Sequence, residues 1–295
     1  MISQVISAVF PVIAVVLVGY IYAHKVSTEV SAINRVNMDI FLPALIFSAL
    51  ATREFNANLD GWLVIATLVI VIGSGFVALP LARWLSVDAK TFCPPMMFSN
   101  SGTLGLPLAL LAFGESEFSN AMLLFVTTNL LFFTLGAYLI GRDVPWRNIL
   151  SSPVVIATFL GMGCGMLALP MSDVVMVPAK LLGEVALPLM LFTLGVRMTA
   201  VRRSDLRVGL AGALMCPLSG LIVAGLLIPW LPLSSDHHAL LLLFAVLPPA
   251  VVNHLLAESY RRDPEKVAAI VVVGHAMSVL FVPLGLTLGL ASAAG

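Results

Sequence analysis

The chain of 295 residues is 60% hydrophobic and 10% charged, and its mean hydropathy is +1.07. This composition excludes a water-soluble globular protein and indicates an integral membrane protein. The 15 basic and 15 acidic residues cancel, so there is no net charge to attract nucleic acid. The three cysteines lack the spacing of a disulfide framework or a zinc site, so we expect no metal and no other cofactor.

Ten membrane-spanning helices are predicted when the chain is divided at clusters of charged and turn-forming residues, because a helix needs roughly 20 mostly apolar residues to cross the hydrocarbon core. They cover residues 3–23, 36–52, 61–83, 91–113, 118–140, 149–169, 177–197, 207–230, 238–257 and 266–290. The first segment has no Lys or Arg before it, so we interpret it as a helix and not as a cleaved signal peptide. The predicted fold class is an all-α polytopic membrane protein.

The basic residues predict how the chain is oriented. Of the 15 Lys and Arg residues, only Arg53 and Lys180 fall on one side of the ten predicted helices, and the other thirteen fall on the opposite side. Loops rich in Lys and Arg stay in the cytoplasm. We therefore expect a protein of the inner (plasma) membrane with its N- and C-termini on the periplasmic side.

Two segments of the chain repeat each other. The second predicted helix reads "DIFLPALIFSAL" from Asp39, and the seventh reads "EVALPLMLFTLG" from Glu184, an offset of 145 residues. Each half holds five predicted helices, and because five is odd the second half enters the membrane from the opposite face. The sequence thus predicts two inverted five-helix repeats, residues 1–140 and 149–295.

Polar residues, glycines and prolines interrupt the fourth and ninth predicted helices. A proline leaves a helical carbonyl without its donor, and such a group must face protein, water or a ligand rather than lipid. A single interruption would favour simple helix packing, but paired interruptions in two inverted halves favour crossed, broken helices that bind a substrate at mid-membrane. Half-helix N-termini there can bind a small anion. The predicted binding residues are Asn100, Ser101, Thr103, Gly105, Pro107, Pro248, Pro249 and Asn253.

The predicted helices contain further polar residues that could act in transport or could have a structural role. Asp39 and Glu184 could couple transport to a cation, or they could lie at the membrane interface near a helix start. His275 in the tenth helix is a further candidate for proton coupling. Arg197, near the end of the seventh helix, is interpreted as an anchor that reaches lipid headgroups.

Four segments of the chain resemble the auxin efflux carrier family, whose bacterial members include organic-acid permeases. They are "NMDIFLPALIFSAL", "NSGTLGLPLALLAFGE", "LPLMLFTLG" and "LPPAVVNHLLAESYRRDPE". The resemblance implies ten helices in two inverted repeats, with substrate held where helices four and nine cross. It also implies a scaffold of helices one, two, six and seven, against which helices three to five and eight to ten move as an elevator. The plant exporters carry an acid within the third helix, whereas residues 61–83 have only Asp60 just outside.

The paired interruptions predict a transporter for a small anion, and the resemblance implies a secondary active transporter for a mono- or dicarboxylate such as malonate or malate. The alternative is an anion channel or facilitative pore for small weak acids, which also needs polar residues at mid-depth. The chain has no "GxSxG" or "HExxH" motif, so we do not expect an enzyme. The partners expected are the anion and the lipid bilayer. The sequence leaves open whether a proton or sodium gradient is used and whether two copies form a homodimer.

Overall fold

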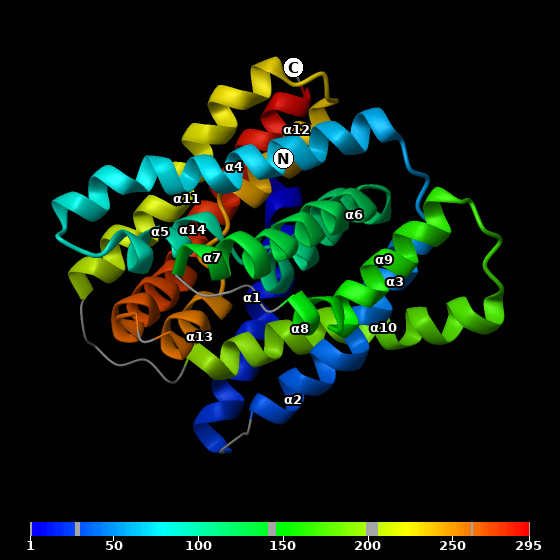
Figure 1. Cartoon of the computed structure of the whole chain (residues 1–295), viewed down its shortest axis with the longest axis horizontal. Helices are drawn as coiled ribbons and strands as arrows, with labels where there is room; N and C mark the ends of the chain where they lie inside the picture. The colour runs from blue at the N-terminus through cyan, green and yellow to red at the C-terminus, as the bar shows by residue number, and fades with distance from the viewer. Residues whose placement is uncertain (1, 27–29, 141–145, 199–205, 261, 295) are drawn as a thin grey trace.

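The computed structural model describes residues 2–26, 30–140, 146–198, 206–260 and 262–294, and within these ranges it is helical, with no β-strand (Figure 1). Seven of the described helices are long and apolar enough to cross a membrane. The all-α polytopic fold class is therefore confirmed. The helices are α1 (Ile2–Lys25), α2 (Val30–Val36), the π-helix η1 (Asn37–Phe41), α3 (Leu42–Ala51), α4 (Ala57–Trp84), α5 (Ala89–Met97), the π-helix η2 (Ser101–Gly105), α6 (Leu106–Leu131), the π-helix η3 (Phe132–Gly136), α7 (Ala137–Ile140), α8 (Trp146–Leu150), α9 (Pro153–Met166), α10 (Asp173–Arg197), α11 (Leu206–Leu227), the 3₁₀ turn η5 (Ile228–Trp230), α12 (Ser235–Ala245), α13 (Val252–Ser259) and α14 (Pro264–Ala294).

The fourth predicted helix is divided: its first part is the separate helix α5, and its second part is joined to most of the fifth predicted helix in one helical stretch, Ser101–Gly136, of 36 residues. A straight helix of this length would measure about 54 Å, much more than the roughly 30 Å of a hydrocarbon core. Gly114 interrupts the stretch with a φ of 79°, a backbone conformation that glycine adopts without steric cost. The break lies where the sequence predicts the fourth helix to end.

Two other predicted helices are also divided. The segment 149–169 contains the end of α8 and then the shorter α9, which begins at Pro153 after the extended Ser152; proline is well suited to the first turn of a helix because it has no N–H to leave unpaired. The segment 238–257 is divided into α12 and α13. Every predicted segment therefore contains helix, while the count of ten spans and their inversion stay predictions.

Some residues used in the sequence analysis lie outside the described ranges. They include most of the link expected between the two repeats, residues 141–145, and four of the basic residues used to predict orientation: Arg142, Arg202, Arg203 and Arg261. Within the described ranges, α1 begins and α14 ends on the same side of the molecule (Figure 1).

The helices pack in two groups that α6 connects. In the first group, α10 packs against α1 and α3, and α3 packs against α9. In the second group, α14 packs against α11 and α12, while α4 packs against α5 and α11. Helix α6 contacts α1 and α3 on one side and α4 and α12 on the other. The first group consists of the predicted helices one, two, six and seven.

The contact between α1 and α10 depends on glycine. A Cβ added at Gly195 would overlap the carbonyl oxygen of Val16 and lie 2.8 Å from the backbone nitrogen of Tyr20. We expect Gly195→Ala to cost about 1–3 kcal/mol of stability, because backbone cannot yield as a flexible side chain can. Thermal unfolding of the purified protein in detergent measures the loss. Gly225→Ala on α11 is the control, since nothing lies within 4 Å of that position, and equal unfolding temperatures for the two variants would contradict the close approach.

Candidate functional site

The two interruptions predicted from the sequence are in direct contact. Ser99, between α5 and η2, forms an antiparallel bridge with Pro249, between α12 and α13. The N–H of Asn100 donates to the carbonyl of Pro248 at 2.7 Å, and the N–H of Ala250 donates to the carbonyl of Phe98 at 2.9 Å. The two broken helices thus satisfy each other's backbone groups where proline removes the helical hydrogen bonds.

Asn100 is the centre of this crossing and is only 4% exposed. Its Oδ1 accepts from the N–H of Thr103 at 3.2 Å, so Asn100 caps the helix that follows. Its Nδ2 lies 2.8 Å from Nε2 of His275, whose Nδ1 lies 2.7 Å from the carbonyl of Val271. A carbonyl can only accept, which assigns the proton to Nδ1 and makes Nε2 the acceptor for Asn100. His275 is therefore neutral in this arrangement and holds the amide of Asn100 in place.

Asn253 joins the two broken helices from the other side. Its Nδ2 donates to the carbonyls of Phe98 at 2.8 Å and Ala250 at 2.9 Å. Its Oδ1 is buried without a hydrogen-bond partner among the described residues. The sequence predicts Asn253 as a substrate-binding residue, and in the structure its amide hydrogens are already used within the crossing.

A cavity of about 480 Å³ lies beside the crossing. Of the residues predicted to bind substrate or ions, Asn100, Ser101, Thr103 and Asp39 line this cavity. The N–H of Gly102, also in the lining, has no acceptor among the described residues, so a half-helix N-terminus offers the cavity a free donor. The lining also includes the exposed Arg35.

The other predicted site residues lie outside the cavity lining. Gly105 allows close packing behind it, since a Cβ there would lie 2.9 Å from Cδ1 of Leu247. Glu184 is exposed on α10. The residues Pro107, Pro248, Pro249, Asn253 and His275 are also absent from the lining.

Arg197 is a cavity residue that the sequence analysis assigned to another role. It was expected to reach lipid headgroups, but it lines the cavity at the end of α10, together with Met190 and Thr193. These three residues follow a spacing of three and four, which places them on one face of a helix. That spacing is the signal in the sequence that could have identified Arg197.

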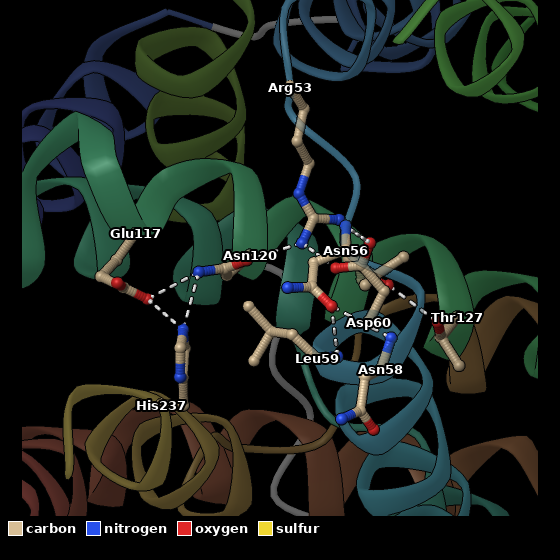
Figure 2. A network of polar contacts seen from close by, with 10 residues as sticks. Arg53, Asn56, Asn58, Leu59, Asp60, Glu117, Asn120, Thr127 and His237 are labelled. Carbon is tan, nitrogen blue, oxygen red and sulfur yellow. Dashed lines mark hydrogen bonds and ion pairs between the residues drawn. The ribbon is translucent and has the colours of Figure 1, made fainter. Parts of the chain in front are cut away.

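A second polar cluster, the Arg53 network, consists of Arg53, Asp60, Glu117, Asn120 and His237 (Figure 2). Arg53 forms an ion pair with Asp60, and its Nη2 also donates to Oδ1 of Asn120 at 2.7 Å. Figure 2 shows Glu117, Asn120 and His237 converging from α6 and α12. Arg35 lies on the continuous helical stretch Val30–Ala51, and Arg53 lies 18 positions further along the chain, just past the end of that stretch. At the helical rise, the two arginines are about 27 Å apart along the helix. The network is thus far from the arginine end of the cavity.

No pattern in the sequence predicts this network. Arg53 was noted only for its charge and Asp60 only for its position outside the third predicted helix. Asn120 and His237 are 117 positions apart, and no local spacing relates either of them to Arg53. Only the fold brings these side chains together.

Comparison with known proteins gives two matches along nearly the whole chain. A family model described as "Membrane transport protein" matches twice, over residues 4–143 and 137–286. The two matched ranges meet close to the predicted boundary between the two repeats. A protein of Methanothermobacter thermautotrophicus described as "Uncharacterized transporter" is 27% identical over 296 residues, which covers 94% of this chain and 95% of that protein.

Proposed function

Because the chain belongs to the membrane transport protein family, the auxin efflux carrier family that its motifs resemble, we propose that it is a secondary active transporter for a small organic anion of the inner membrane. Membership of a transport family is consistent with the expectation that the protein is not an enzyme. Malonate and malate are the first substrates to test, because the resemblance implies small mono- or dicarboxylates.

The observation that carries this proposal is the cavity beside the crossed helices. Its charged lining residues are Arg35, Asp39 and Arg197, which leaves an excess of one positive charge. The free N–H of Gly102 and the capping amide of Asn100 add polar groups beside that charge. An excess of positive charge next to a helix N-terminus favours an anion.

The packing of the helices supports an elevator mechanism. The group α1, α3, α9 and α10 corresponds to the proposed scaffold. The group α4, α5, α11, α12 and α14 corresponds to most of the proposed transport unit, which also includes α6 and α13. In our proposal ten helices form two inverted repeats, residues 1–140 and 149–295, and the crossing lies at mid-membrane. Both chain ends then face the periplasm.

The separation of the cavity from the Arg53 network favours a carrier over a channel. The cavity lining reaches the exposed Arg35, but none of the five network residues belongs to it. A channel needs a polar path from one side of the membrane to the other, whereas a carrier is closed at one end in each of its states.

The test of the proposed function is uptake of radiolabelled carboxylates by the purified protein in liposomes. We expect saturable uptake of malonate, malate or a related small acid, and competition by the unlabelled acid. A panel of mono- and dicarboxylates that all fail to enter above the rate of protein-free liposomes would overturn the proposal.

Arg197→Gln tests the cavity itself. We expect the uptake rate at low substrate concentration to fall by about 10-fold, because a positive charge lining the cavity attracts the anion and raises its local concentration. The loss should shrink at high ionic strength, where such attraction is screened. Arg207→Gln is the control, since Arg207 is exposed and stacks on Trp84 at 5.4 Å, away from the cavity. Equal uptake by both variants would exclude a role for Arg197 in anion entry.

A further inference from the structure

Within the Arg53 network, three side chains share one proton-sensitive contact. Nδ2 of Asn120 lies 2.9 Å from Oε2 of Glu117 and 3.1 Å from Nε2 of His237. An amide nitrogen only donates, so Nε2 of His237 must accept and its proton belongs on Nδ1. Nδ1 lies 2.7 Å from the hydroxyl of Ser234, which can accept it. The arrangement therefore requires a neutral His237.

A second proton on His237 is incompatible with this arrangement. It converts Nε2 into a donor, which then faces the amide hydrogens of Asn120, and two donors repel. Oε2 of Glu117, 3.7 Å away, is the acceptor that a protonated Nε2 can reach with a small rotation. Protonation thus exchanges the contact between Asn120 and His237 for an ion pair between His237 and Glu117.

Asn120 connects this exchange to Arg53. The same amide that contacts His237 through Nδ2 accepts from Arg53 through Oδ1, at 2.7 Å. Arg53 lies between α3 and α4, while Asn120 is on α6 and His237 is on α12. A proton taken up by His237 therefore changes a contact that links the end of α3 to the second group of helices.

We propose that Glu117 and His237 form the binding site of the proton that drives transport, and that Asn120 passes the change to Arg53. This inference rests on the proposed transport function and names its coupling ion. The proton moves from solvent to Nε2 of His237, and no other bond forms or breaks. The side chains of His237 and Glu117 retain 12% and 17% exposure, so solvent protons can reach the site although it is mostly buried.

The charged surroundings make His237 the group that responds. Arg53 and Asp60 already neutralise each other in an ion pair. The neighbours of His237 in sequence are His238 and the exposed Asp236. On α6, which packs against α12, the exposed Glu115 lies two positions before Glu117. Among the described residues, Glu117 is the carboxylate within 4.0 Å of His237. Helix α14, which packs against α12, has no titratable residue after His275. Helix α11 also packs there, and its one charged residue, Arg207, lies at its start.

The first test measures cavity access without any substrate. Asn129→Cys places a thiol in the cavity lining. The same protein carries Cys164→Ser, because Cys164 is partly exposed and could also be labelled, whereas Cys93 and Cys216 are buried. We expect its rate of labelling by a membrane-impermeant maleimide to change by about threefold or more between roughly pH 8 and pH 5, as the populations of the two states shift. His237→Gln should abolish this dependence, and Glu117→Gln should weaken it, because the protonated Nε2 of His237 then has no carboxylate to pair with. His254→Gln, whose Nδ1 contacts the carbonyl of Pro264, should leave the dependence unchanged.

The second test measures coupling in liposomes, with radiolabelled malonate as the probe. An imposed pH gradient should accelerate malonate uptake by the wild type, and His237→Gln should remove the acceleration. Malonate uptake whose rate does not depend on the pH gradient would overturn the proposed proton site but would still support the proposed transport function. Labelling that titrates through His237, in a protein that carries no carboxylate, would support the proton site and overturn the proposed function. A pH dependence of labelling that survives in a folded His237→Gln variant would overturn the inference directly.

Discussion

Asp60→Asn should destabilise the protein by about 3–5 kcal/mol, because it leaves a buried guanidinium without its counter-charge. Arg53 is 7% exposed and Asp60 is 9% exposed. Burial lowers the pKa of Arg53, and the charge of Asp60 opposes that shift. Asp60 also accepts from the N–H of Asn56 at 2.9 Å, so its carboxylate holds the start of α4. Unfolding free energies from denaturant titration in detergent measure the loss.

The control for Asp60→Asn is an ion pair on the surface. Asp88 lies 3.5 Å from Arg262, and their side chains are 47% and 37% exposed. Exposed pairs contribute about 0–1 kcal/mol, so Asp88→Asn should change stability little. The double variant Arg53→Met with Asp60→Leu should recover much of the loss, because apolar residues of similar volume remove the uncompensated charge. If Asp60→Asn and Asp88→Asn unfolded alike, the Arg53 network would have no role in stability.

The local features of this fold were predictable from the sequence. Each segment that hydropathy selected contains helix in the structure, because membrane helices satisfy their own backbone and need only sufficient apolar length. Proline and glycine located the two interruptions that the structure places in contact at Ser99 and Pro249. Helix ends were less predictable, as at Pro153, where the proline and not the apolar run begins the helix.

The direction of individual side chains was not predictable. Asn253 was expected to face the substrate, but its amide hydrogens bind the carbonyls of Phe98 and Ala250. An amide suits a ligand and a broken helix equally well, so its type alone does not distinguish these roles. Arg197 was misread for a similar reason, since a long cation at a helix end can reach lipid or a cavity. The Arg53 network needed contacts over more than 60 positions, such as Arg53 to Asn120, which no local pattern encodes.

The crossing and the Arg53 network differ in how completely their polar groups are paired. Near the crossing, the N–H of Gly102, a residue of the cavity lining, has no acceptor among the described residues. In the Arg53 network, most polar groups are paired with each other: Nη2 of Arg53 contacts Asp60 and Asn120, while its Nη1 has no hydrogen-bond partner among the described residues. Unpaired polar groups are costly to bury without a ligand, so the crossing is the part of the structure that gains most from binding one.

Asn100→Ala should reduce transport by at least about 30-fold. The change removes the helix cap on Thr103, which costs about 1 kcal/mol, and leaves Nε2 of His275 buried without its donor, which costs about 1–3 kcal/mol. The crossing beside the cavity therefore loses roughly 2–4 kcal/mol of stabilisation. Each 1.4 kcal/mol corresponds to about a tenfold change in the population of the binding-competent structure, and hence in the transport rate. Initial rates of radiolabelled carboxylate uptake in liposomes measure the effect.

A matched control separates loss of a cap from loss of the site. Asn56 caps α4 as Asn100 caps its helix, accepting from the N–H groups of Asn58 and Leu59, but it is exposed and does not line the cavity. Asn56→Ala should therefore lower the melting temperature and leave uptake near the wild-type rate. Asn253→Ala should reduce uptake as well, since it removes one of the two hydrogen bonds that the carbonyl of Phe98 accepts within the crossing. Among the described side chains, Asn100 is the one that both caps that helix and contacts His275. Full uptake by folded Asn100→Ala protein would therefore exclude a role of the crossing in transport.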